Sequence, residues 1–274
     1  MLRAIAEARG ESMTLRRSRS LEAACISLCG AVLASITTPA GADPLAATRL
    51  DTARFGYAAS AFVAPVGYGG RTGSLALGMI TERERGDASI AVAASVGDPD
   101  RWLALDTAVV ISSLSDRSLG QAGFGEEGSL AFKLHRNVGE STAVAIGSSA
   151  VPRWGGSVYR ASNPAGHYVA LSHAVPLGNQ LLMLSGGAGQ NVTNKNGNSD
   201  DLFGVDLFAA LAWYPHHGLS LIGEYDGYCV NAALSVAPLF RWWPLTLTAG
   251  YVDLLSDHNR TPRLTLLASV AYAF

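Results

Sequence analysis

The chain has 274 residues, a length that one large β-barrel domain or two smaller domains can fill. Apolar residues make up 49% of it and charged residues only 15%, well below the roughly 25% that is typical of soluble domains. The formal net charge of −2 provides no basic surface, so nucleic acid is excluded as a partner.

Residues 1–42 are predicted to be a signal peptide that is removed after export. Three arginines precede an apolar stretch over residues 23–36: Arg16, Arg17 and Arg19. Ala40-Gly41-Ala42 then provides a small-x-small cleavage site, and Met13 is an alternative start of translation. The apolar stretch is too short to span a bilayer, and the alternative interpretation is a short buried helix.

Removal of the signal peptide changes the charge and the cysteine count. It takes away five Arg and three Glu, which leaves 15 basic and 19 acidic residues and a net charge of −4. Cys25 and Cys29 leave with it, so Cys229 remains alone and an intramolecular disulfide is impossible.

The rest of the chain alternates between apolar and small or polar residues with the period of two that is typical of β-strands. In residues 203–214, for example, Val205 and Leu207 fall on one face and Asp206 on the other. Strands are predicted over 73–82, 88–96, 102–113, 128–136, 141–151, 166–175, 179–188, 203–214, 217–226, 230–240, 244–253 and 263–274. Twelve such segments are typical of an all-β, antiparallel up-and-down transmembrane barrel, although a soluble sandwich alternates too.

The lengths of the connections also alternate, which indicates the two sides of a barrel. Counted back from residue 274 in the periplasm, the outer loops are LSDHNRTPR, DGYC, NVTNKNGNSD, PRWGGSVYRASNPAG, LSDRSLGQAGFGEEG and ERERGD. The periplasmic turns are FRWWP, PHHG, PLGN, NVGES and GDPDR. Apart from DGYC, most outer loops are the longer, so residues 73–274 are predicted to form the barrel.

Residues 53–65 alternate as well. A thirteenth strand would contradict the even strand number of single-chain bacterial barrels. The segment 43–72 is therefore predicted to pack on the barrel or inside it, unless one hairpin has been divided wrongly.

Aromatic residues gather at the strand ends assigned to the periplasm: Trp102, Trp213, Tyr214, Trp242, Trp243, Tyr272 and Phe274. A girdle at the level of the lipid headgroups accounts for them, with Trp213, Trp242 and Trp243 as its main members. The alternative is that these residues cap a soluble core.

Several stretches resemble a known group of proteins. GLSLIGEYDGYCVNAALSVAP, PLTLTAGYVDL and the closing PRLTLLASVAYAF resemble the C-terminal hairpins of predicted outer-membrane barrels of cyanobacteria and proteobacteria, related to the YjbH-type proteins. GEEGSLAFKLHRNV is similar to the same group. The resemblance covers most of residues 70–274 and implies an outer-membrane location and a connection with exopolysaccharide production. The last strand also resembles the aromatic C-terminal signal that the barrel-assembly machinery reads, which implies that role for Tyr272 and Phe274.

Charged or ionisable residues occupy the predicted lumen faces of several strands. They are Asp106, Lys133, His135, Asp206 and Glu224. Such residues either set ion selectivity or form a network that fills the interior.

Patterns for catalysis or metal binding are weak. His216 and His217 are adjacent in a predicted turn, where their side chains point apart and no acidic or cysteine partner is near in sequence. Glu224 and Asp226 are two residues apart, as a hydrolytic carboxylate pair could be, but Asp226-Gly227 is typical of a hairpin turn. No G-x-S-x-G or phosphate-loop motif occurs, so no enzyme activity, metal or cofactor is predicted.

The sequence therefore predicts an exported outer-membrane β-barrel without disulfides that serves as a passive conduit or as a structural component of the envelope. Its expected partners are outer-membrane lipid and the barrel-assembly machinery, with polysaccharide or small solutes as candidates for what it carries. The alternatives are an outer-membrane hydrolase and a soluble periplasmic β-sandwich that binds a ligand.

Overall fold

A computed structural model of the chain describes residues 58–82, 88–112, 114, 123–162, 164–192, 205–216, 218–238, 243–255 and 262–273. The predicted signal peptide lies outside these residues, as do Trp242 and Phe274. Among the described residues, no helix has the length and hydropathy that crossing a membrane requires.

Twelve long strands make up most of the described part of the chain. They are β1 (Ser74–Glu82), β2 (Ala88–Gly97), β3 (Ala104–Ile111), β4 (Gly128–Asn137), β5 (Thr142–Ser149), β7 (Gly166–Leu177), β8 (Gln180–Gln190), β9 (Asp206–His216), β10 (Leu219–Tyr225), β11 (Val230–Val236), β12 (Leu245–Val252) and β13 (Arg263–Ala273). Each of them coincides with one predicted strand, and only the ends differ by a few residues. A short strand, β6 (Arg153–Trp154), and a one-turn helix, α2 (Ser157–Ser162), lie between β5 and β7.

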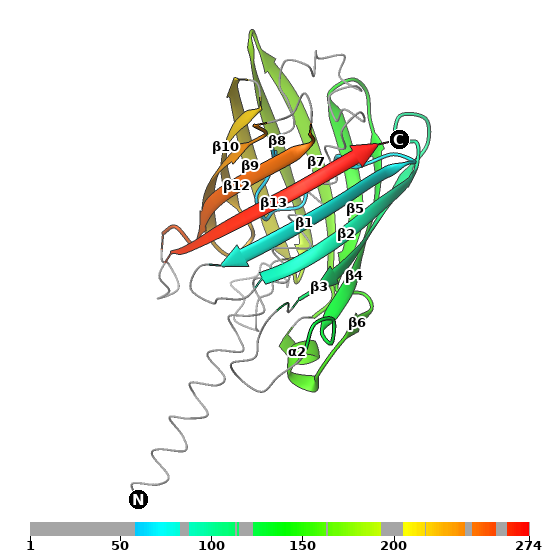
Figure 1. Cartoon of the computed structure of the whole chain (residues 1–274). Coiled ribbons are helices and arrows are strands. Elements are labelled where there is room, and N and C mark those ends of the chain that lie inside the picture. Colours follow the sequence, from blue (N-terminus) through cyan, green and yellow to red (C-terminus); the bar gives the residue numbers. More distant parts are fainter. Residues whose placement is uncertain are drawn as a thin grey trace, which may run out of the picture.

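These twelve strands form one closed antiparallel sheet. The first strand, β1, pairs with the last, β13, from Ser74↔Ala273 to Glu82↔Thr265, and β3 pairs with β4 to complete the ring. Figure 1 shows β13 lying beside β1, with the strands inclined around the barrel. The predicted all-β antiparallel barrel of about twelve strands is confirmed, and the soluble sandwich of two sheets is ruled out.

The two ends of the barrel differ in the lengths of their connections. Connections 98–103, 138–141, 178–179, 217–218 and 237–244 lie at one end, which we call the turn end. The other end, the loop end, has three much longer connections, 112–127, 150–165 and 191–205, together with 83–87, 226–229 and 253–262.

The loop between β5 and β7 contains structure that the sequence does not predict. The strand β6 pairs with β4 through Gly128↔Trp154 and Ser129↔Arg153, where β4 extends past its pairing with β5. The helix α2 follows it beyond the loop end (Figure 1). These short elements form because the projecting part of β4 offers free backbone groups that the loop can pair with.

Burial alternates with period two along the strands, which separates an outer face from an inner one. In β9, Leu207 is 62% exposed and Leu211 45%, whereas Asp206 and Phe208 between and beside them are buried. Other strands also turn large apolar side chains outward: Leu75, Val92, Ile146, Val169, Leu221, Leu234 and Leu266. Leu267 of the last strand is an apolar residue on the inner face and lies in an apolar cluster with Ile80. The barrel therefore has an apolar exterior and an interior that combines small and polar residues with buried apolar clusters.

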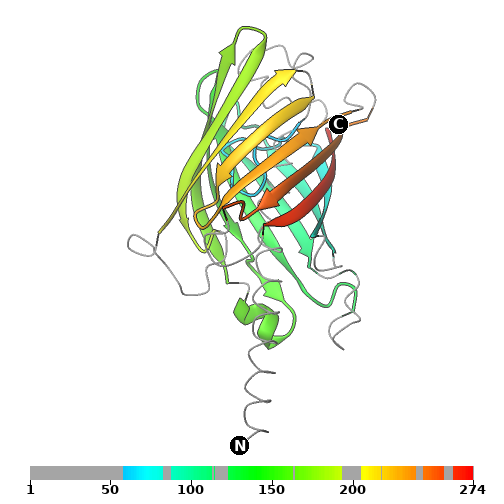
Figure 2. The ribbon, with the colours of Figure 1, turned by 90° about the vertical axis from the view of Figure 1, so that its left-hand side faces the viewer.

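Residues 58–70 lie inside the barrel (Figure 2) and form neither helix nor strand. Phe62 packs in an apolar cluster with Leu181, and Val66 packs in another cluster with Phe208. The alternation that marks residues 53–65 does not produce a strand over 58–65, because several backbone N–H groups there bond to wall side chains instead of a neighbouring strand. We call residues 58–70 the inner segment.

Candidate functional site

The inner segment, AASAFVAPVGYGG, crosses the barrel from one wall to the opposite one. Its first residues contact β10 and β11, and its last residues contact β3 and β4, which stand across the ring in the strand order. Small residues allow this close packing. At Gly67, an added Cβ would collide with the carbonyl of Ala143, so only glycine fits against that wall.

Glu224 of β10 binds the middle of the inner segment. Its Oε2 accepts hydrogen bonds from the backbone N–H of Phe62 (2.9 Å) and Ala64 (3.2 Å), and its Oε1 accepts one from Val63 (2.7 Å). Asn231 Nδ2 donates to the same carboxylate at 3.1 Å. A carboxylate thus serves as the acceptor for three consecutive buried N–H groups that no strand pairs with, which fixes the position of this part of the chain.

A second buried cluster holds the other end of the inner segment. Asp106 Oδ2 lies 3.2 Å from Lys133 Nζ, and Asp106 Oδ1 lies 3.3 Å from His135 Nε2. Lys133 donates to the carbonyl of Tyr68 at 2.7 Å, and Asp106 accepts from Gly70 N at 3.2 Å. All three side chains are almost fully buried, and buried charges need partners. The ammonium of Lys133 and the carboxylate of Asp106 are partners of each other, and the inner segment provides a further acceptor and a further donor.

Hydroxyl groups on the inner wall make further bonds to the inner segment. Ser235 Oγ accepts from Ala59 N at 2.9 Å, and Ser220 Oγ donates to Ala59 O at 2.6 Å. Ser172 Oγ accepts from Gly67 N at 2.8 Å. These serines and Asn231 carry no motif of their own in the sequence, and the signal that could have identified them is their position on the inner face of alternating strands.

The five charged residues predicted for the lumen are all buried on the inner face. Asp106, Lys133, His135 and Glu224 belong to the two clusters that contact the inner segment. Asp206 of β9 is separate from them and accepts a hydrogen bond from Val192 N at 3.3 Å.

Several of the aromatic residues predicted for the girdle face outward, and one does not. Trp102 is 76% exposed, Trp243 65% and Trp213 37%, and Tyr272 is half exposed on the outer face of β13. The prediction is wrong for Tyr214, which points inward and donates through its hydroxyl to Ala58 O at 3.1 Å. The reason is parity: Tyr214 follows Trp213 directly, so the two side chains point to opposite faces of β9.

Two further predictions concern the turn between β9 and β10 and the hairpin at the loop end. His216 is the last residue of β9 and pairs with Leu219 instead of lying in the turn, while His217 falls outside the described residues. Asp226 Oδ1 accepts from the backbone N–H of Tyr228 and Cys229, each at 2.9 Å, as hairpin-turn chemistry requires. Burial, together with the Asp226 carboxylate, raises the pKa of the Cys229 thiol.

The described residues do not assemble a hydrolytic or metal site. Ser148 Oγ lies 2.8 Å from His167 Nδ1 on the outer face, but in the described part of the chain no acidic residue bonds to the imidazole to orient it. Within the same residues, no group of three His, Cys, Asp or Glu side chains is placed to hold a metal ion. This geometry gives the hydrolase alternative no support.

Comparisons with known proteins add little to the geometry. No protein-family model matches the chain. No curated protein matches it either. Among solved structures, the chain is similar to an outer membrane channel from Pseudomonas putida F1, with a TM-score of 0.44 and 13% sequence identity over 73% of this chain and 96% of that one. Because this similarity is so distant, we base no functional conclusion on it.

Proposed function

We propose that the chain is an outer-membrane β-barrel that acts as a narrow passive conduit, with the inner segment lying across its lumen. The observation that carries the proposal is a closed sheet with an apolar outer face and an inner face that carries buried charged and polar side chains. In hydrocarbon every backbone polar group needs an internal partner, and a closed barrel provides one for each strand.

The outer face supports a lipid environment. Leu77, Val92 and Val169 are 46%, 52% and 56% exposed on three different strands. Soluble proteins rarely expose apolar side chains over such a continuous surface, because leaving apolar surface in water costs roughly 25 cal/mol of free energy per Å². Aromatic residues near the turn end, such as Trp102 and Trp243, fit the level of the headgroups.

The unequal ends support an orientation. In outer-membrane barrels, short turns face the periplasm and longer loops face the outside. The turn end is therefore assigned to the periplasm. Ala59 and Arg71, near the two ends of the described inner segment, both contact groups at this end, since Ala59 bonds to Ser220 near the start of β10 and Arg71 bonds to Asp100 in the 98–103 turn.

The inner segment determines how such a conduit would behave. Its backbone and apolar side chains occupy space between opposite walls, so we expect low conductance while both polar clusters hold it. Passage of small solutes would use the remaining space or would follow displacement of the segment.

Two measurements test this function on protein purified from membranes. Migration on a denaturing gel should change on boiling, and the protein should fractionate with the outer membrane. In planar bilayers it should give small, ohmic current steps. An unchanged migration with recovery in the periplasmic soluble fraction would disprove the barrel, and complete absence of current under all applied voltages would disprove the conduit.

The connection with exopolysaccharide, which the sequence resemblance implies, is the more specific part of the proposal. The charged and hydroxyl side chains of the inner wall support passage of hydrophilic material, and a polymer chain would have to displace the inner segment, which bonds to opposite walls. Deletion of the gene should lower secreted polysaccharide without lowering its synthesis inside the cell. Normal secretion in the deletion strain would remove this connection and leave the barrel function unaffected.

A further inference from the structure

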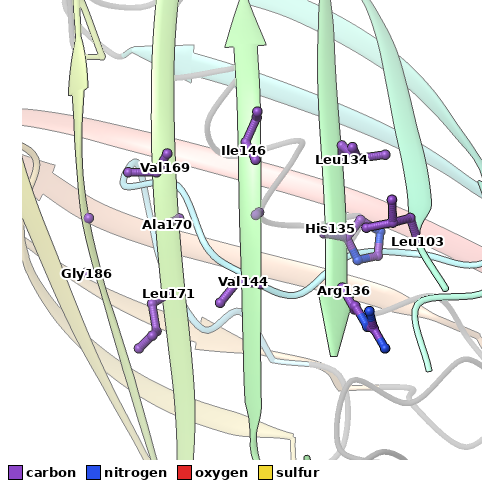
Figure 3. A pocket seen from close by; sticks show the side chains of 12 residues that line it. Leu103, Leu134, His135, Arg136, Val144, Ile146, Val169, Ala170, Leu171 and Gly186 are labelled. Atoms are coloured by element: carbon purple, nitrogen blue, oxygen red, sulfur yellow. The ribbon is translucent and has the colours of Figure 1, made fainter. Parts of the chain in front are cut away.

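The outer face of the barrel has an apolar depression of about 400 Å³ that spans β4, β5, β7 and β8 (Figure 3). Its rim consists of outward-facing side chains that the cross-strand register places in rows. The rim residues are Leu103, Leu134, Val144, Ile146, Val169 and Leu171. The depression is therefore part of the surface that meets lipid.

A glycine that faces outward leaves open space in the depression. Gly186 faces outward on β8, directly opposite Leu171 of β7, which itself pairs with Val144 of β5. An added Cβ at Gly186 would have only one ordinary contact, 3.5 Å from Phe208 O, so the space above this glycine is open. By contrast, an added Cβ at Gly187 would collide with the carbonyl of Val169 and with the Phe208 ring, because that position faces inward.

A positive charge lies at the turn-end edge of the depression. Arg136 is the outward neighbour of His135 near the end of β4, pairs with Val144 in the register, and is exposed. In the described part of the chain its guanidinium has no acidic or hydrogen-bonding partner, and the exposed Trp102 lies in the adjacent turn. A second apolar depression of about 410 Å³ on β1 and β11–β13 has no charged residue in its lining.

We propose that this depression binds one anionic phospholipid of the inner leaflet, phosphatidylglycerol, with the headgroup phosphate on Arg136 and an acyl chain in the depression. The inference rests on the proposed function, because it requires the outer face to meet lipid with the turn end toward the periplasm. Arginine presents a planar fork of donors that matches phosphate oxygens. Arg136 lies near the turn end of β4, which the proposed orientation places next to the periplasmic headgroups.

The two parts of the site contribute differently. Lipid tails are as apolar as the protein surface, so an acyl chain in the depression contributes only the van der Waals contacts that it makes by filling the space. These contacts retain the lipid but do not distinguish one headgroup from another. The guanidinium provides the preference for an anionic headgroup, and one basic residue near an anionic surface corresponds to about a fivefold preference.

Native mass spectrometry of the membrane-extracted protein, equilibrated with phosphatidylglycerol and phosphatidylcholine of identical chains, tests both parts. The wild type should retain phosphatidylglycerol over phosphatidylcholine. Arg136→Gln should lower that ratio about fivefold, toward parity, and keep lipid bound. Gly186→Ile fills the depression and should lower retention of both lipids without changing their ratio.

Two variants serve as matched controls. Arg101→Gln removes the same charge at the same end of the barrel, from an exposed arginine beside Asp98 in the 98–103 turn, and should leave the ratio unchanged. Gly223→Ile adds the same bulk to the outer face of β10, where an added Cβ has nothing within 4 Å, and should leave retention unchanged.

The outcomes that would overturn the inference are distinct from failure of the proposed function. A wild-type ratio at parity, equal effects of Arg136→Gln and Arg101→Gln, or equal effects of Gly186→Ile and Gly223→Ile would each refute this site. Each variant is first checked for heat-modifiable migration. A wild type that lacked this property would count against the barrel itself.

Discussion

Replacing Glu224 by alanine tests how the inner segment is held. The carboxylate accepts backbone hydrogen bonds from Phe62, Val63 and Ala64 at 2.9, 2.7 and 3.2 Å. Each bond contributes about 1 kcal/mol net, since water that enters the lumen would satisfy part of what is lost. Together they stabilise the attached state by about 3 kcal/mol, so Glu224→Ala should raise the detached population about a hundredfold.

Hydrogen exchange followed by mass spectrometry measures this population directly. Amide protection in the inner segment should fall about a hundredfold in Glu224→Ala, while protection of the β7–β8 hairpin stays at its wild-type level. In planar bilayers the same variant should open more often or to larger current steps. Both effects have one cause, the release of the segment from β10.

Asp206→Ala is the matched control for this experiment. Asp206 is another buried inner carboxylate, on the neighbouring strand, and its hydrogen bond comes from Val192 N. It should leave the exchange of residues 62–64 unchanged. Wild-type protection in Glu224→Ala, or an equal loss of protection in both variants, would refute the reasoning.

Three more predictions concern buried groups. Lys133→Met leaves Asp106 buried without the Lys133 ammonium and should lower the free energy of urea-induced unfolding by about 3 kcal/mol. Adding Asp106→Asn should restore most of this loss, and a double variant no more stable than the single one would contradict the prediction. Gly69→Ala would place a methyl group against the Asp106 carboxylate and should reduce amide protection of the inner segment, unlike Gly223→Ala, which meets nothing within 4 Å. Burial raises the pKa of Cys229, so near pH 8 its alkylation by iodoacetamide should be about a hundredfold slower in the folded barrel than in urea. The rate in the folded barrel should rise with pH as thiolate forms, and equal rates in both states would show that the thiol is accessible.

Much of the fold could be predicted because each barrel strand has an alternating pattern in its own sequence. The outward and inward residues of β9 alternate in the sequence as they do in the structure, and the same holds for Asp106, Lys133 and Glu224 on their strands. A period of two needs no knowledge of the partner strand. Tyr214 is the exception. Its aromatic side chain at a strand end predicts a girdle position, but its place in the alternation of β9 puts it on the inner face.

The inner segment shows the limit of such reasoning. Residues 58–65 alternate like a strand, yet Glu224 and Ser235, more than a hundred residues away, accept N–H groups that a strand would have paired. β6 and α2 likewise depend on the part of β4 that projects beyond β5. No local pattern contains this information, because the acceptors come together only when the sheet closes.

The sequence by itself therefore determined the strand positions, the two faces, and the unequal ends, since these depend on side-chain alternation and turn composition along the chain. Only the tertiary structure decided what fills the lumen, which buried charges meet one another, and where Arg136 stands beside open space on the outer face. Those features depend on register between strands and on closure of the ring, which bring residues from distant parts of the chain to the same height on the wall.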